Sequence, residues 1–173
     1  MNRQLLTTSF FFQTFQYLVK WEDYSCFDTT WEPENHIPAH LRTEYEHPSL
    51  TCELIQSASD KFLYCIKGRL NQRCGGHFYV DLDHTHFRFF FGSQETSKLC
   101  LKDDFRKFIL PPDWDIFYYS EEGEGRKIDF PVKISTNLKW SKKHFTKTDN
   151  EKLVPAKRCP FESWKVELST IRI

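Results

Sequence analysis

Glycine and methionine are scarce in this sequence, and neither sign of charge is in excess. The 173 residues include 6 Gly, 8 Pro and 1 Met, and 24 Lys and Arg residues balance 24 Asp and Glu residues. So little Gly and Pro argues against a low-complexity chain. A net charge of zero gives no overall electrostatic signal for nucleic acid. No apolar run reaches the ~20 residues that a membrane-spanning helix needs, so we expect no membrane partner.

The six cysteines do not have the spacing of a metal site or a disulfide framework. No two of them form a Cys-x-x-Cys pair, which is the usual mark of zinc and redox motifs. A zinc site is a second interpretation, because His77, Asp81, Asp83, His84 and His86 are concentrated in one predicted hairpin. His84 and His86 would bind the metal together with His77 or Cys74, but the spacing matches no standard pattern. The sequence also has no phosphate-binding loop and no nucleophile elbow. We therefore expect free thiols, no metal, no cofactor and no enzymatic activity.

Aromatic residues, in contrast, are abundant and point to strands. They form 17% of the chain, and Phe alone accounts for 17 residues. The run Tyr17–Trp21 has the aromatic and β-branched composition of a strand. A polar turn follows, and Thr29 begins a second extended segment that Pro33 ends, because proline has no backbone donor. The two segments predict a hairpin, with Trp21 and Tyr24 at its mouth and at least one of the two rings exposed.

This hairpin resembles a chromodomain. The resemblance rests on the runs Tyr17-Leu18-Val19-Lys20-Trp21 and Thr30-Trp31-Glu32-Pro33-Glu34 at the family's spacing, and it covers roughly residues 13–47. It implies a small β-sheet closed by one C-terminal helix, and a nuclear, chromatin-associated protein. It also implies a partner, a methylated histone H3 tail that binds as an added strand and places its methylammonium group in an aromatic cage.

The resemblance implies the site residues as well. Trp21 and Tyr24 match two cage aromatics, and Asp28 matches an acidic position beside the cage, while Glu32 and His36 match positions along the peptide groove. A methylated ammonium is attracted to each ring face by ~0.5–2 kcal/mol. The family's third cage aromatic lies on an upstream strand that has no counterpart here, so we expect a partial cage.

These features divide the chain into three parts. Residues 1–12 form an atypical N-terminus, because Ser9 to Gln13 is what a pyrimidine tract and CAG at an intron's end would encode. Residues 13–48 form the chromodomain-like module without its first strand, with a helix between Pro38 and Pro48. Residues 49–173 form an unassigned, β-rich region.

We expect the whole chain to be α+β and strand-rich, with residues 49–173 mostly antiparallel and containing one or two helices. Alternating or aromatic runs predict the strands, and apolar spacings of three and four predict a helix over 97–110. Residues 141–160 are polar and predict a long loop. The expected strands are 61–66, 78–82, 85–91, 114–119, 128–134, 137–140 and 161–173.

Basic residues predominate over residues 126–158 and suggest a second function. Lysine with interleaved aromatics can contact phosphates and stack on bases; the candidates are Lys139, Trp140, Lys142, Lys143 and Lys147. A solvated loop that balances the acidic residues 113–124 is the alternative. A chromodomain-derived module that reads no methyl-lysine is the second functional interpretation, because integrase tails of mobile elements have runs similar to Trp31–Pro38. The oligomeric state stays open.

Overall fold

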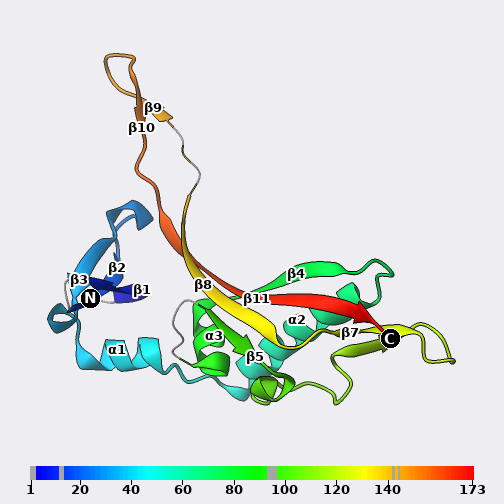
Figure 1. Ribbon diagram of the computed structural model, residues 1–173. Helices are drawn as coiled ribbons and strands as arrows, with labels where there is room; N and C mark the ends of the chain where they lie inside the picture. Colours follow the sequence, from blue (N-terminus) through cyan, green and yellow to red (C-terminus); the bar gives the residue numbers. More distant parts are fainter. Residues whose placement is uncertain (1–2, 12–13, 93–96, 142, 144) are drawn as a thin grey trace. The chain divides into compact units, whose positions relative to one another are not determined.

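The chain was analysed as a computed structural model that describes residues 3–11, 14–92, 97–141, 143 and 145–173 (Figure 1). It divides into two compact units. The first unit contains residues 1–45 and 137–162, and the second contains residues 46–136 and 163–173. The domain division expected from the sequence differs from this one, because residues 137–162 fold with the N-terminal part.

The first unit is built on a three-stranded antiparallel sheet in the order β1-β2-β3. Strand β2 is central, and its residues Tyr17, Leu18 and Val19 are all buried. Tyr45 on the following helix packs edge-on against Tyr17, with ring centroids 6.1 Å apart. The strands are β1 (Arg3–Phe11), β2 (Thr14–Trp21) and β3 (Thr30–Pro33), and the helix is α1 (Ala39–Glu46).

Strand β1 corrects the expectation that the module lacks its first strand. Its backbone pairs antiparallel with β2 over the whole length, from Arg3 opposite Trp21 to Phe11 opposite Thr14. Leu5 joins Tyr17, Val19 and the rest of the small core. The resemblance places the family's first strand farther upstream, so the sequence does not predict that residues 3–11 pair with β2.

The second unit contains a six-stranded sheet with two helices (Figure 1). Its strands follow the order β5-β8-β11-β7-β6, and β4 pairs with β11. The strands are β4 (Gly76–Leu82), β5 (Ser97–Cys100), β6 (Ile116–Tyr118), β7 (Gly125–Ile128), β8 (Val132–Trp140) and β11 (Pro160–Arg172). The helices are α2 (Cys52–Leu70) and α3 (His84–Phe91). The fold is therefore α+β and largely antiparallel, as predicted.

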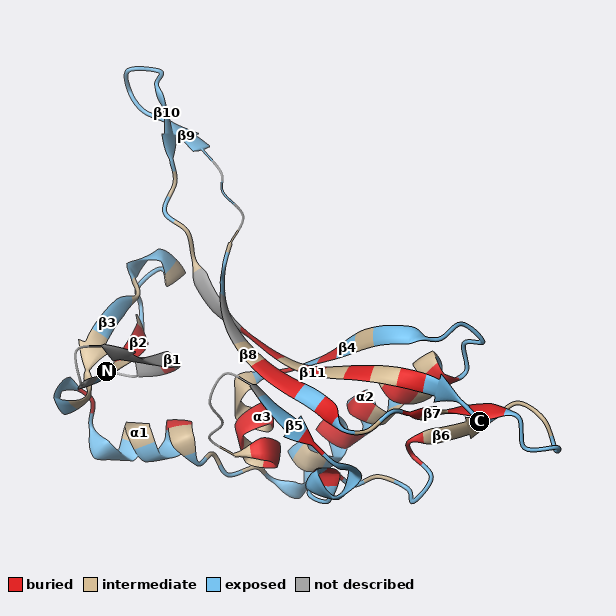
Figure 2. Cartoon of the chain, viewed as in Figure 1, coloured by how far each residue is buried: buried red, intermediate tan, exposed pale blue. Residues whose placement is uncertain are grey.

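Two segments predicted as strands are helical, and burial explains the difference. In α2 the buried residues Phe62, Ile66 and Leu70 are four apart, which places them on one helical face (Figure 2),. The hydroxyl of Thr51 accepts a hydrogen bond from the backbone N–H of Leu54 and caps this helix,. Helix α3 is capped by Asp83, whose side chain accepts a hydrogen bond from the backbone N–H of His86. Its residues Phe87, Phe90 and Phe91 are buried in the core.

The predicted helix over 97–110 is also wrong. The segment forms strand β5 and a short 3₁₀ helix, Lys102–Phe105. Phe105 and Phe108 enter the aromatic core, while Leu99 and Leu101 are exposed. The apolar residues of this segment are therefore not on one helical face: some are buried in the core and others are exposed to solvent.

The predicted loop 141–160 contains a small antiparallel ribbon, β9 (Phe145–Lys147) paired with β10 (Leu153–Pro155). All six residues of the two strands are exposed (Figure 2). We call residues 139–159, which join β8 to β11 through this ribbon, the arm. No helix in the described part of the chain is long and apolar enough to cross a membrane.

Candidate functional site: an aromatic pocket

A cavity of about 550 Å³ opens beside the β2–β3 connection in the first unit. Three aromatic rings line it, those of Trp21, Tyr24 and Phe27, together with the carboxylate of Asp28. The Tyr24 side chain is 63% exposed and that of Phe27 is 38% exposed. The other lining residues are Thr29, Thr30 and Lys157. The site thus combines three aromatic residues with one acidic and one basic residue at an open surface.

The connection between β2 and β3 brings these residues together. Asp23 adopts a left-handed backbone conformation with φ of 64°, which Asp tolerates better than most residues. A 3₁₀ turn, Cys26–Asp28, follows. Ser25 caps this turn, because its hydroxyl accepts a hydrogen bond of 3.3 Å from the Phe27 backbone N–H. The chain therefore turns back so that Tyr24 and Phe27 reach the same cavity as Trp21.

A short relay of hydrogen bonds holds the indole of Trp21. Its Nε1 donates to the hydroxyl of Thr30 at 3.0 Å. The same hydroxyl donates to Oε1 of Glu32 at 2.7 Å. Trp21 also packs against the small core of the first unit. The ring is thus fixed on one side while it lines the pocket on the other.

The structure places the predicted cage residues Trp21, Tyr24 and Asp28 around one cavity. Glu32 and His36, predicted for the peptide groove, do not line it; they form their own pair, with 3.1 Å between His36 Nδ1 and Glu32 Oε2. Glu32 instead contributes by orienting Thr30.

Phe27 and Lys157 line the cavity and were missed in the sequence analysis. The only signal for Phe27 was its place as an aromatic residue in the polar connection between the two predicted strands. No sequence signal identified Lys157, which approaches from the arm. Its Nζ lies 3.7 Å from Oδ1 of Asp28.

The arm also meets the connection between β2 and β3 at a pair of thiols. The thiols of Cys159 and Cys26 are hydrogen-bonded, and burial, followed by this hydrogen bond, raises the pKa of the Cys159 thiol to about 11. The Cys159 N–H donates to the hydroxyl of Ser141 at 2.9 Å, and the Ser141 N–H donates to the Cys159 carbonyl at 2.8 Å. These bonds join the two strands of the arm at its base.

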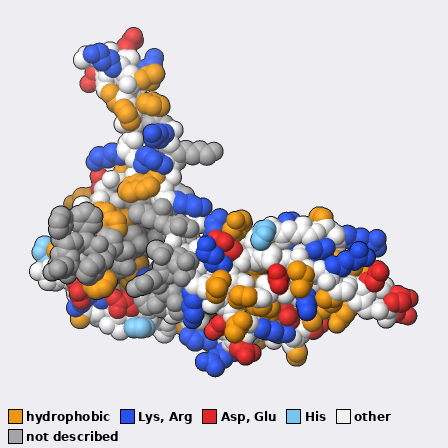
Figure 3. Space-filling view, viewed as in Figure 1, with side chains coloured by type: hydrophobic (Ala, Val, Ile, Leu, Met, Phe, Trp, Pro, Cys, Tyr) orange, Lys and Arg blue, Asp and Glu red, His pale blue; other side chains and the backbone are white. Residues whose placement is uncertain are grey.

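The predicted nucleic-acid residues lie along the arm and not in the pocket. Lys139, Trp140, Lys143 and Lys147 are exposed. Figure 3 shows Lys and Arg side chains along the ribbon. Lys142 lies outside the described residues. The Arg158 guanidinium donates to the carbonyls of Ser141 and Trp140 and so supports the base of the arm.

Two residues of the cluster weighed as a zinc site, Asp83 and His86, have a structural role at the start of α3. Asp83 caps this helix by accepting from the backbone N–H of His86, and its carboxylate also contacts the His86 ring. Among the described residues, no three His, Cys, Asp or Glu side chains are grouped so that they could hold a metal ion.

Comparison with known families bears on the part of the chain that forms the pocket. Residues 4–47 match the model of the Chromo (CHRromatin Organisation MOdifier) domain. Comparisons with curated proteins and with solved structures give no significant match. The match includes β1, β2, β3 and α1, while Lys157 and the second unit lie outside it and are assigned to no family. Residues 4–47 therefore form a chromodomain, a module typical of chromatin-related proteins.

Proposed function

We propose that this protein is a nuclear chromatin reader that binds a methylated lysine of a histone H3 tail in the aromatic pocket. The observation that supports this function is the arrangement of Trp21, Tyr24 and Phe27 with Asp28 around one open cavity. We infer a binding function, since the pocket combines three aromatic residues with an acidic residue at an open surface.

The chemistry of the pocket suits a methylated ammonium better than a bare one. An unmodified lysine ammonium is compact and strongly hydrated, so burying it against rings loses hydration. A methylated ammonium has a larger, less hydrated surface, and each ring face attracts it by ~0.5–2 kcal/mol. Phe27 supplies a third ring from within the hairpin connection, so the cage is not limited to two rings.

A peptide would reach this pocket along the chromodomain sheet. Backbone pairing at a sheet edge gives affinity that tolerates different sequences, and side-chain pockets then fix the register. In the three-stranded sheet β2 is central, so β1 and β3 are the outer strands. We propose that the His36–Glu32 pair lies along the peptide beside the cage.

The test is a titration of the full chain with H3-tail peptides, each trimethylated at one lysine, against the unmodified peptide. Tyr24→Ala is the cage variant, because Tyr24 is exposed and its removal leaves the core intact. Trp140→Ala removes an exposed ring outside the pocket and is the matched control. We expect the wild type and the control to prefer one methylated peptide and Tyr24→Ala to lose that preference. Equal affinity of the wild type for all peptides would overturn the proposal.

A second candidate function, nucleic-acid contact, is favoured by the composition and exposure of the arm. Residues 139–158 contain seven Lys or Arg against two Asp or Glu, although the whole chain is neutral. Phe145 and Lys147 lie two apart on β9, so both point to one face of the exposed ribbon,. A two-stranded ribbon fits the major groove of duplex DNA. The test measures duplex DNA binding at increasing salt concentration in the wild type and in Lys147→Glu. Affinity that falls steeply with salt, and is lower in Lys147→Glu, would support this function. Affinity that changes with neither salt nor the substitution would contradict it.

A further inference from the structure

Lys157 forms an ion pair with Asp28, the acidic residue of the pocket. Its Nζ lies 3.7 Å from Oδ1 of Asp28, and its side chain is 77% exposed while that of Asp28 is 44% exposed. Lys157 also lines the same cavity as the three rings. The pocket therefore contains a cation of the protein's own beside the seat proposed for the ligand.

The backbone close to Lys157 is held by hydrogen bonds at the base of the arm. Two residues farther on, Cys159 exchanges backbone and side-chain hydrogen bonds with Ser141, and its free thiol is within hydrogen-bonding reach of the Cys26 thiol. Cys26 begins the 3₁₀ turn that ends at Asp28. The arm is thus attached to the pocket wall next to the residue that Lys157 pairs with.

The methylation states of lysine differ in what they need from a carboxylate. Monomethyl- and dimethyl-lysine keep two and one N–H donors, and each donor requires an acceptor when it is removed from water. Trimethyl-lysine has no N–H donor, so ring faces alone can satisfy it. A free carboxylate in the cage therefore favours the lower states, while a carboxylate already paired with a cation does not.

We propose that Lys157 determines the methylation-state preference of the pocket. Because its ammonium group pairs with Asp28, the pocket prefers trimethyl-lysine to dimethyl-lysine. This inference rests on the proposed methyl-lysine binding. It assigns specificity to a residue of the arm, outside the matched chromodomain, so the arm is part of the site.

The size of the effect follows from the exposure of the pair. Surface ion pairs contribute little and are screened by salt, and a hydrogen bond to a charged group contributes somewhat more, so we expect a change of about threefold to tenfold in the preference. The change should be larger at low salt than at high salt.

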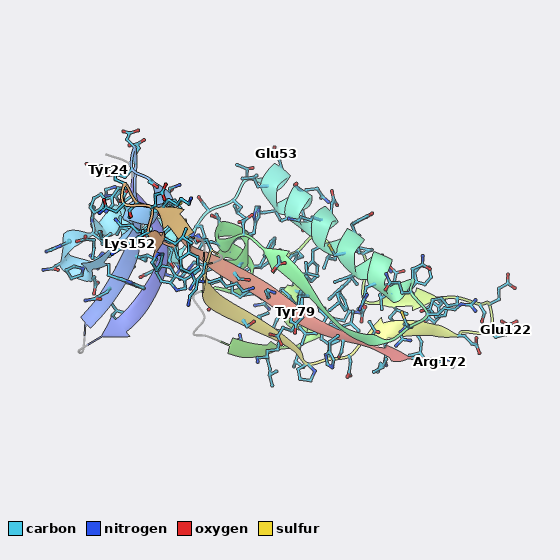
Figure 4. The ribbon with its side chains drawn as sticks, turned by 90° about the horizontal axis from the view of Figure 1, so that it is seen from above. Tyr24, Glu53, Tyr79, Glu122, Lys152 and Arg172 are labelled. Atoms are coloured by element: carbon cyan, nitrogen blue, oxygen red, sulfur yellow. The ribbon has the colours of Figure 1, made fainter. Side chains whose placement is uncertain are left out.

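The experiment measures the ratio of trimethyl- to dimethyl-lysine peptide affinity in the full chain. Lys157→Met removes the charge and keeps an apolar stem, so the ratio should fall by about threefold to tenfold. Lys157→Arg keeps the charge and should keep the wild-type ratio. Lys152→Met is the control on the same arm (Figure 4), since Lys152 does not line the pocket. Asp28→Asn should make the ratio insensitive to Lys157→Met, because the negative charge that pairs with Lys157 is then gone,.

The outcomes separate the two proposals. If the wild type binds methylated peptides and Lys157→Met leaves the ratio unchanged, the role of Lys157 is overturned while methyl-lysine reading stands. If the ratio falls equally in Lys152→Met, the effect is one of general charge and the assignment to Lys157 is wrong. If no methylated peptide binds in preference to the unmodified one, both proposals are overturned.

Discussion

The indole N–H of Trp21 donates a hydrogen bond of 3.0 Å to the hydroxyl of Thr30, across the connection between β2 and β3. This bond fixes the plane of a ring that lines the aromatic pocket. Because the Thr30 hydroxyl in turn donates to Glu32, the ring orientation depends on β3 as well as on β2.

Thr30→Val should weaken methyl-lysine binding without unfolding the chain. The variant keeps the shape of the side chain but removes the acceptor for Trp21, and a lost hydrogen bond of this kind changes the free energy by about 0.5–1.5 kcal/mol. The affinity for the preferred methylated peptide should therefore fall by a few fold. Thr146→Val, on an exposed strand of the ribbon, is the matched control. Calorimetric titration measures the affinity of the wild type and of both variants. Equal affinities of the wild type and Thr30→Val would show that the Trp21 ring does not need the hydrogen bond to Thr30.

Phe27→Ala tests the third ring. Phe27 lines the pocket, and a ring face contributes ~0.5–2 kcal/mol to the binding of a methylated ammonium. The affinity for the methylated peptide should fall by between about twofold and 30-fold, while the weak affinity for the unmodified peptide should change little. Phe145→Ala, which removes an exposed ring from the arm, should change neither value. A cage of two rings alone would make the two variants indistinguishable.

Residues 61–66 were predicted as a strand but belong to helix α2, and they show why part of the fold could not be predicted from the sequence. Phe62, Tyr64 and Ile66 alternate with Leu63 and Cys65, and both sets are apolar. A half-buried strand is recognised by apolar residues that alternate with polar ones, so this segment could not be distinguished from a helix by its periodicity. In the structure Phe62 and Ile66 are fully buried while Tyr64 is 82% exposed. Spacing by four fits those exposures and spacing by two does not. The local pattern was ambiguous, and the tertiary packing of α2 decided it.

The chromodomain hairpin was predictable for the opposite reason. Its turn residues are distinctive, and the family spacing of Trp21, Tyr24 and Asp28 predicted three of the residues that line the pocket. Lys157 could not be predicted in this way, because its place beside Asp28 depends on the path of the arm. Strand β1 could not be predicted either, because its composition does not show that it pairs with β2.

The helical assignment of α2 can be tested by stability. Phe62→Ala should lower the free energy of unfolding by about 3–5 kcal/mol, because it opens a cavity in the aromatic core of the second unit. Tyr64→Ala should lower it by no more than about 0.5 kcal/mol, because the ring is exposed. Denaturant titration of the two variants decides between helix and strand. In a strand the two side chains would share a face and the two losses would be similar.

The paired thiols give a prediction about pH. Burial, and then the hydrogen bond with Cys26, raises the pKa of the Cys159 thiol to about 11, against about 8.5 for a thiol in an unfolded chain. The neutral thiol is thus favoured in the folded state. Its contribution to stability is fully present below about pH 8.5 and is lost as the pH rises through about 11.

Alkylation measures this directly, because the thiolate is the nucleophile. At pH 8 iodoacetamide should modify Cys159 much more slowly than the exposed Cys52 and Cys74, and the rate at Cys159 should keep rising toward pH 11. Cys26→Ala removes the hydrogen bond and should shift the Cys159 profile to lower pH, while Cys65→Ala should not. Peptide mapping by mass spectrometry resolves the sites. If Cys159 reacted as fast as Cys52 at pH 8, the arm would not be held against the pocket wall, and the position proposed for Lys157 would lose its support.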